Sequence, residues 1–363
     1  MFESEKLEGQ LVKIWESLLG RQGVSVHDNF WELGGHSLMA VRMMHHIDET
    51  VGKDLPIEVL LQAPSIAKLA RLIRQSSVPQ STSLIALKTS GSRPPLFCMH
   101  GIGGLIVRFR DLARYLAPEH PLYALQAQGV DGKHPPLGRI EDMAAHYLEE
   151  IRTVQPRGPY NLGGLSFGGW RAFEMAQQLR SRGEEVGLLV LFDTFRENRS
   201  IQALVLKLLR LPPRASFAYV FQKASGLWAG SLRHRIFRPP LPLPLNSVGK
   251  ALYSAWDAYV PQPYLGKVTF FRPRLRSLRS SDGPSAGWRD LAGGELEIYE
   301  VPGDHNNMLE EPQVRVLARQ LNACLDKSRQ SGSPASISEP TLAPSGPCAE
   351  PARLKLAFRD SSC

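Results

Sequence analysis

The chain has 363 residues, 43% of them hydrophobic, which is enough for two folded units with ordinary apolar cores. Its formal net charge is +8 at pH 7, but this charge is unevenly spread. Residues 1–76 hold eight basic and ten acidic side chains, whereas residues 196–250 hold ten basic side chains and one acidic side chain. Because no recognition helix, zinc module or aromatic stacking platform accompanies this basic segment, the charge does not predict nucleic-acid binding.

The sequence carries no signal for export or for membrane insertion. Residues 1–6 lack the basic start and apolar stretch of a secretory signal, and every apolar run is too short to cross a bilayer. Four cysteines lie far apart, without a CxxC pair or the spacing of metal ligands: Cys98, Cys324, Cys348 and Cys363. These features predict a reduced, cytoplasmic location and no metal site.

The first 76 residues predict a small all-α bundle. Apolar side chains recur there at steps of three and four, which places them on one face of a helix. Three such runs lie near residues 7–18, 38–51 and 66–73. The polar stretch at residues 75–82 has no periodicity, so we expect a linker and the first strand of the next unit at residues 77–93.

From about residue 84, short apolar runs alternate with helical stretches, notably at residues 105–116, 140–154 and 167–180. This alternation predicts an α/β domain over residues 94–328, with a mostly parallel sheet and helices on both faces. The expected strands lie at residues 84–87, 95–99, 122–125, 160–165, 186–192, 268–271 and 296–301. The alternation breaks after Thr194, which predicts an inserted helical lid at about residues 196–256. The Ser- and Pro-rich residues 329–363 predict a disordered tail.

Ser37 begins the second helical run and follows two glycines, Gly34 and Gly35. These glycines leave the backbone open to a modifying enzyme, and a phosphodiester on Ser37 would lie at the positive end of a helix dipole. A serine before an apolar run can also simply cap the helix. The string DNFWELGGHSL at residues 28–38 resembles the phosphopantetheine attachment motif of peptidyl carrier domains in non-ribosomal peptide synthetases.

This resemblance to carrier domains covers residues 4–75, with Trp31 standing where the family usually has a second phenylalanine. It implies that 4'-phosphopantetheine is bound covalently to Ser37. The group would come from coenzyme A and be attached by a phosphopantetheinyl transferase.

Ser166 is the candidate nucleophile of the second domain. It lies in Gly164-Leu165-Ser166-Phe167-Gly168, between an expected strand and an expected helix. The small residues of a G-x-S-x-G motif permit a strained turn that lifts the serine hydroxyl above the sheet. The order of strand, motif and helix distinguishes this match from a coincidental glycine turn.

A serine hydroxyl needs a base, and in α/β-hydrolases the acid and the base follow the nucleophile along the chain. Asp193 directly follows the expected strand at residues 186–192, and His305 follows the strand at residues 296–301. We therefore predict His305 as the general base and Asp193 as the acid that orients it. Asp304 is an alternative acid, but adjacent side chains diverge in direction.

Two backbone N–H groups should stabilise the oxyanion of the reaction. One belongs to Phe167, the residue after the nucleophile, and the other to the glycine-rich loop at residues 100–104, where we assign it to Ile102. This loop also serves as a tight turn from strand to helix, and the two roles are compatible. We interpret His100 as structural.

Residues 94–326 resemble a type I thioesterase of non-ribosomal peptide synthetases, with matching strings at each of these sites. The resemblance implies a mobile helical lid, and a re-entry into the sheet at residues 258–269. It also implies that an acyl, aminoacyl or peptidyl thioester on Ser37 passes to Ser166. The cargo is then released by hydrolysis or cyclisation.

Three other functions are compatible with parts of this pattern. A free esterase or lipase would have the same fold but no use for a carrier, and an acyltransferase would pass the cargo to an external amine or alcohol. A carrier and interaction module with an inactive hydrolase half is the third. Because Met1 lies just before the first expected helix, we expect loading in trans, by an adenylating enzyme or an upstream synthetase module.

Overall fold

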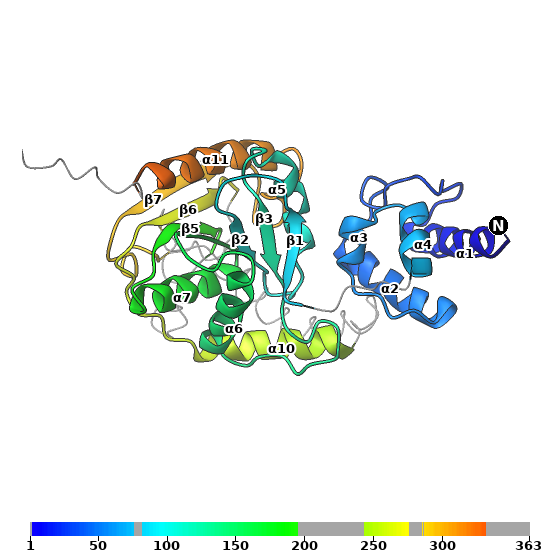
Figure 1. Ribbon diagram of the computed structural model, residues 1–363, viewed down its shortest axis with the longest axis horizontal. Helices are drawn as coiled ribbons and strands as arrows, with labels where there is room; N and C mark the ends of the chain where they lie inside the picture. The colour runs from blue at the N-terminus through cyan, green and yellow to red at the C-terminus, as the bar shows by residue number, and fades with distance from the viewer. Residues whose placement is uncertain (1, 76–81, 195–242, 276–284, 286, 332–363) are drawn as a thin grey trace, which may run out of the picture.

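The computed structural model describes residues 2–75, 82–194, 243–275, 285 and 287–331. Most of the predicted lid and nearly all of the predicted tail lie outside these residues. The described chain forms a helical N-terminal region followed by an α/β region (Figure 1). Helix α4 ends at Gln75 and strand β1 begins at Leu84, and the proposed domain limits at residues 76, 93 and 328 stay a prediction.

The N-terminal region is a bundle of four helices. They are α1 (Phe2–Leu19), α2 (Ser37–Val51), α3 (Val59–Gln62) and α4 (Ile66–Gln75). Their apolar faces meet in one core in which Leu11, Trp15, Phe30, Ile47 and Leu69 are fully buried. The three periodic runs of the sequence correspond to α1, α2 and α4. Helix α3 was not predicted, because four residues are too few to show a helical period.

The second region is built on a seven-stranded sheet with the order β1-β3-β2-β4-β5-β6-β7. The strands are β1 (Leu84–Lys88), β2 (Leu96–Met99), β3 (Leu122–Leu125), β4 (Tyr160–Leu165), β5 (Val186–Phe192), β6 (Val268–Pro273) and β7 (Leu296–Val301). Among these described strands, β1 pairs antiparallel with β3 and the other pairs are parallel. The predicted mostly parallel sheet is therefore confirmed.

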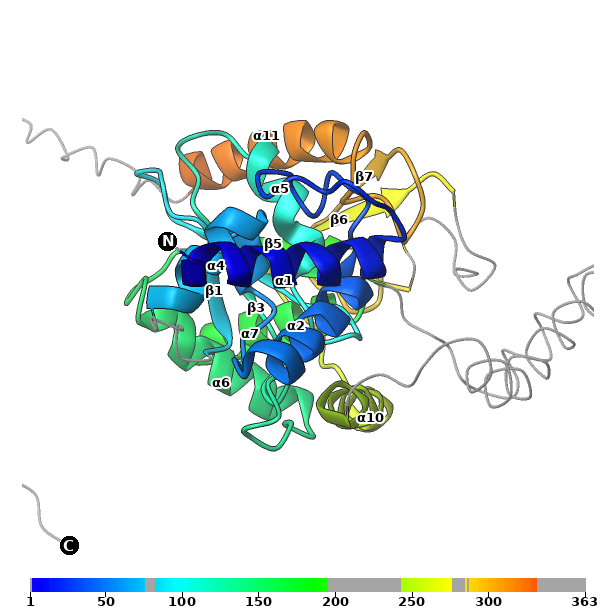
Figure 2. The same cartoon turned by 90° about the vertical axis from the view of Figure 1, so that its right-hand side faces the viewer.

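Helices cover both faces of this sheet, as predicted (Figures 1 and 2). One face carries α6 (Ile140–Arg152), α7 (Gly168–Ser181) and α10 (Leu243–Ala258), and the other carries α5 (Arg110–Tyr115) and α11 (Val314–Ser331). The stretch predicted as one helix near residues 105–116 begins instead as a 3-10 turn, η1 (Val107–Phe109). Among the described helices, none combines the length and apolarity needed to span a membrane.

Helix α10 contains the residues of the predicted lid that the structure describes. It packs Val248, Leu252 and Ala255 into the same core as α6 and α7. Its Trp256 ring meets the ring of Phe167, the residue after the candidate nucleophile, at 5.8 Å between centroids. The end of the predicted lid segment is thus packed directly beside the candidate site.

Candidate active site

Ser166 lies in a sharp turn between β4 and α7. Its φ of 55° is in the left-handed region, which a residue other than glycine rarely adopts. The Ser166 N–H donates to the carbonyl of Phe192 at 2.8 Å, which ties the turn to the end of the neighbouring strand β5. The candidate nucleophile is therefore held at the carboxyl edge of the sheet, directly before a helix N-terminus.

Two glycines of the motif are required by close backbone contacts. A Cβ on Gly164 would collide with the backbone of Gly168, and a Cβ on Gly168 would collide with the carbonyl oxygens of Met99 and His100. The first contact lets the turn close on itself, and the second lets α7 approach the loop after β2. Substitution at either position would push apart segments that carry candidate site residues.

Asp193 and His305 meet at the same edge of the sheet. Asp193 directly follows β5, is 9% exposed and has a φ of 42°, and its N–H donates to the carbonyl of Phe271 at 2.9 Å. His305 lies in the loop after β7, and its Nδ1 is 2.6 Å from Oδ2 of Asp193. Such a contact requires the proton on Nδ1 and directs the basic lone pair of the imidazole to Nε2.

The carboxylate of Asp304 has a different local role. Its Oδ1 accepts hydrogen bonds from the backbone N–H groups of Asn306 at 2.7 Å and Asn307 at 3.2 Å. A side chain that caps its own turn in this way shapes the loop that presents His305. The geometry therefore favours Asp193 over Asp304 as the orienting acid.

Arg108 is a site residue that the sequence did not reveal. Its Nη2 donates to the carbonyl oxygens of His305 at 2.9 Å and Asn306 at 2.5 Å. Burial lowers the pKa of this guanidinium, and the nearby charges of Glu310 and Asp304 oppose that shift. In the sequence, Arg108 lies in a short run of mixed polar and apolar residues and resembles a surface arginine. Only the folded structure shows that it holds the loop of His305.

The two predicted oxyanion residues lie on segments that pack together. Phe167 occupies the N-cap position of α7, and Ile102 lies in the loop after β2; both belong to one apolar cluster. His100 is fully buried, and its Nε2 lies 2.9 Å from the hydroxyl of Tyr147 on α6. This burial agrees with the interpretation of His100 as structural rather than catalytic.

Ser37 is the first residue of α2, and the N-cap position belongs to His36, whose side chain makes no capping hydrogen bond. The structure therefore does not show Ser37 as a simple N-cap of α2. The side chain is partly exposed, and no acidic residue lies in the first turn. A phosphate ester at this position would meet the positive end of the helix without a nearby carboxylate in that turn, so the residues present fit a phosphopantetheine arm.

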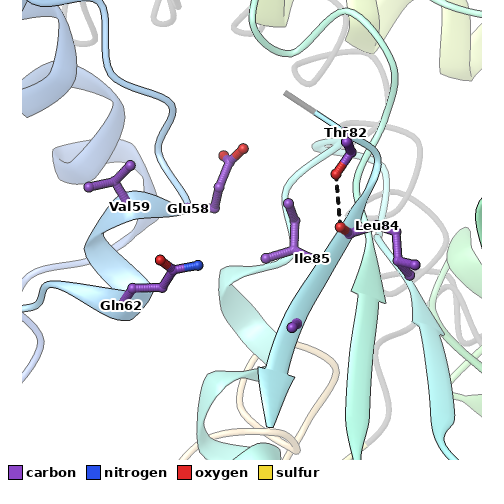
Figure 3. A pocket seen from close by; sticks show the side chains of 7 residues that line it. Glu58, Val59, Gln62, Thr82, Leu84 and Ile85 are labelled. Carbon is purple, nitrogen blue, oxygen red and sulfur yellow. Dashed lines mark hydrogen bonds between the residues drawn. The ribbon is translucent and has the colours of Figure 1, made fainter. Parts of the chain in front are cut away.

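Polar contacts join the bundle to the α/β region. Gln126 Nε2 donates to Oε1 of Glu58 at 3.0 Å, and Lys133 pairs with Asp54 at 3.3 Å. Glu58 is 4% exposed, and this burial raises the pKa of its carboxyl. A small cavity lies beside Glu58, between α3 and β1 (Figure 3).

Trp31, the departure from the carrier motif, also lies at this contact. Its indole N–H donates to the carbonyl of Leu60 at 3.2 Å, and the guanidinium of Arg110 lies 4.9 Å from the centre of its ring. Phenylalanine could stack against the arginine but could not donate the hydrogen bond.

One group of potential metal ligands occurs in the described part of the chain: Glu119, His120 and Asp326. Arg93 forms ion pairs with Asp326 and, at 3.3 Å, with Glu119. A guanidinium therefore already neutralises these carboxylates, and the group does not indicate a metal centre.

Comparison with known families agrees with both halves of this arrangement. The model of the thioesterase domain matches residues 94–208, and the model of the phosphopantetheine attachment site matches residues 9–73. The chain is a carrier–thioesterase didomain. Its curated relatives include the dimodular nonribosomal peptide synthase of Bacillus subtilis, 32% identical over 87% of this chain, and the malpibaldin synthetase of Mortierella alpina, 34% identical over 90%. The didomain spans 14% and 6% of the lengths of these two synthetases.

Solved structures give the same assignment. The holo form of AB3403, a four-domain nonribosomal peptide synthetase bound to AMP and glycine, aligns over 87% of this chain and 26% of its own, with a TM-score of 0.56 and 27% identity. The NocB thioesterase domain, in a covalent complex with a fluorophosphonate nocardicin G analogue, aligns over 67% of this chain and 99% of its own. Its TM-score is 0.51 and its identity 26%. The predicted fold class, family and phosphopantetheine cofactor are thus confirmed.

Proposed function

We propose that this didomain holds an acyl, aminoacyl or peptidyl group as a thioester on Ser37 and releases it through an ester on Ser166. The setting is the biosynthesis of a non-ribosomal peptide or a related secondary metabolite. The observation that carries this proposal is the 2.6 Å contact between Asp193 and His305, at the sheet edge where Ser166 lies in its strained turn. A phosphopantetheine attachment domain in the same polypeptide supplies the reason for a thioester substrate.

Phosphopantetheine on Ser37 would supply the thiol that carries the cargo. In the first half-reaction, Ser166 Oγ attacks the thioester carbonyl while Nε2 of His305 takes the serine proton. Asp193 holds the imidazole in the required tautomer and stabilises its positive charge. The amides of Phe167 and Ile102 donate hydrogen bonds to the oxyanion, and Nε2 of His305 gives its proton to the leaving group as the C–S bond breaks.

The second half-reaction releases the cargo from Ser166. His305, neutral again, removes a proton from water or from a nucleophile within the cargo, which attacks the ester carbonyl. The same two amides stabilise the second oxyanion, and the proton returns to Ser166 as the C–O bond breaks. Water as nucleophile gives hydrolysis, and an internal amine or hydroxyl gives cyclisation.

The proposal also assigns partners and a location. A phosphopantetheinyl transferase with coenzyme A would modify Ser37, and an upstream synthetase module or an adenylating enzyme would supply the cargo. We place the protein in the cytoplasm, where coenzyme A and these enzymes are available.

The test uses the intact chain loaded directly with a short acyl-phosphopantetheine, which a broad-specificity transferase takes from acyl-coenzyme A. Intact-protein mass spectrometry then follows the loss of the acyl mass over time. The unmodified chain should lose it, Ser166→Ala should retain it, and Ser37→Ala should never gain it. Ser181→Ala, an exposed serine at the other end of α7, is the matched control and should behave as the wild type.

Equal release by wild type and Ser166→Ala would overturn the proposal. Rapid turnover of a soluble ester together with no release from Ser37 would support the free esterase instead. Failure of a fluorophosphonate to label Ser166 would support an inactive hydrolase half. Release that occurs only with an added amine or alcohol would indicate an acyltransferase.

A further inference from the structure

A fully buried arginine contacts both segments that carry the candidate oxyanion donors. Arg171, in the first turns of α7, is 0% exposed, and its Nη2 donates to the carbonyl oxygen of His100. Its Nε and Nη1 find no hydrogen-bond partner among the described residues. Burying a guanidinium without a carboxylate costs free energy, and burial lowers the pKa of Arg171 to about 10. An apolar side chain would avoid this cost, so we expect the guanidinium to serve a purpose that requires a charged donor.

The ring of His100 makes a further contact with the loop after β2, which carries Ile102. Its Nδ1 lies 2.6 Å from the carbonyl oxygen of Gly101 and 3.1 Å from Nη2 of Arg171. Burial, together with the charge of Arg171, holds the pKa of His100 well below its usual value, so the ring is neutral. Its Nε2 lies 2.9 Å from the hydroxyl of Tyr147, which itself donates to the carbonyl of Gln126 at 3.2 Å.

These contacts set the direction of one peptide plane. The carbonyl oxygen of Gly101 lies 2.6 Å from His100 Nδ1 and accepts from the N–H of Gly104 at 3.1 Å. In a trans peptide the C=O of one residue and the N–H of the next point in opposite directions. With the Gly101 carbonyl held toward the His100 ring, the N–H of Ile102 is turned away from that ring, as an oxyanion donor must be.

The same guanidinium contacts the residue that bears the other donor. The Arg171 Cζ lies 4.4 Å from the centre of the Phe167 ring, within the range of a cation–π contact. Phe167 is the N-cap of α7, so its backbone N–H is fixed by the entry into this helix. One side chain therefore joins the two segments that carry the amides of Ile102 and Phe167.

We propose that Arg171 is a positioning residue that holds these two amides at the spacing required by the oxyanion. It acts through the His100 carbonyl on one side and through the Phe167 ring on the other, without touching the substrate. The inference rests on the proposed function, because it assumes that these amides serve the reaction of Ser166. Methionine could fill a similar volume, but it can neither donate to His100 nor present a charged plane to Phe167.

The test compares Arg171→Met, Arg171→Lys and the wild type on a soluble acyl-N-acetylcysteamine thioester. A boronic acid that forms a tetrahedral adduct with Ser166 provides a second readout. For Arg171→Met we expect kcat to fall roughly tenfold to a hundredfold with KM unchanged, and boronate affinity to fall by a similar factor. Arg171→Lys keeps a donor and should recover part of the loss. Arg180→Met, an exposed arginine on the same helix, is the matched control and should match the wild type.

Wild-type kcat and boronate affinity in a folded Arg171→Met variant would overturn the inference. So would a loss confined to KM, which indicates a change in ground-state binding. If Arg171→Met fails to fold, as judged by circular dichroism and thermal unfolding, Arg171→Lys decides the question. It keeps a donor but removes the guanidinium plane over Phe167, so kcat should fall below that of the wild type, and a wild-type kcat there would also overturn the inference. An inactive wild type would instead refute the proposed function.

Discussion

Asp193 and His305 are 112 positions apart in the chain, yet Oδ2 of the aspartate lies 2.6 Å from Nδ1 of the histidine. Asp193 follows β5 and His305 follows β7, and the parallel strand β6 lies between these two strands in the sheet. The carboxyl ends of parallel strands share one edge, so loops that are distant in sequence converge there. Ser166, after β4, lies at the same edge.

This contact predicts different effects for the two neighbouring candidate acids. Asp193→Asn would lose the charge that stabilises the imidazolium and would allow the wrong tautomer, so we expect kcat to fall by about 10³-fold or more. Asp304→Asn keeps an oxygen that can accept from the N–H groups of Asn306 and Asn307, so kcat should stay within about threefold of wild type. Steady-state kinetics on a soluble thioester measures both. The opposite order of effects would identify Asp304 as the acid.

Ser37→Ala should abolish modification of the carrier. Incubation with coenzyme A and a broad-specificity transferase should add one phosphopantetheine mass to the wild type and none to this variant. His36→Ala is the matched control, because His36 makes no side-chain cap to α2 and the helix should persist without its ring. Peptide mapping by mass spectrometry that located the added mass elsewhere would contradict the assignment.

Arg108→Met should impair the reaction although Arg108 lies 197 positions from His305 in the chain. Loss of its hydrogen bonds to the carbonyls of His305 and Asn306 should let the histidine loop move, and we expect kcat to fall about tenfold with little change in KM. Kinetics on the soluble thioester checks this. Arg114→Met, an exposed arginine on α5, is the control. Equal activity of the two variants would show that the loop does not depend on Arg108.

Glu58 predicts a pH-dependent contact between the carrier and the thioesterase. Burial raises the pKa of Glu58 in the docked state above its ordinary 4.5, so docking takes up a proton. The contact should therefore be strongest below that ordinary value and weaken as pH rises through the raised pKa. Burial is the largest cause of this shift. A backbone hydrogen bond and the hydrogen bond from Gln126 lower the pKa of Glu58, and the smaller effects of Asp131 and Lys133 raise and lower it, respectively.

Small-angle scattering of the whole chain between pH 4.5 and 8 tests this dependence. The radius of gyration of the wild type should increase with pH, whereas Glu58→Gln, which keeps an acceptor for Gln126 without the charge, should show a smaller increase. Glu32→Gln, an exposed glutamate of the bundle, is the control and should behave as the wild type. A wild-type radius independent of pH would rule out Glu58 as the controlling group.

Much of the fold could be predicted because its signals are local. The periodic runs indicated α1, α2 and α4, and all seven short apolar runs correspond to strands of the sheet. Helix α3 was missed because four residues carry no period, and the 3-10 start at Val107 was missed because hydrophobic periodicity does not distinguish a 3-10 turn from an α-helix. Ser166, Asp193 and His305 could also be predicted as candidate site residues, because each follows the carboxyl end of a strand and they occur in the required order along the chain.

The two domains, the phosphopantetheine motif and three candidate catalytic side chains could be recognised without the fold, because each depends on residues close together in the chain. The folded structure was needed to show that Asp193 contacts His305 and to reveal which side chains hold the site in place. Arg171 contacts His100 across 71 positions, and Arg108 contacts His305 across 197. No local pattern distinguishes these arginines from surface arginines, since their roles arise from burial and from backbone carbonyls that the folded sheet brings beside them.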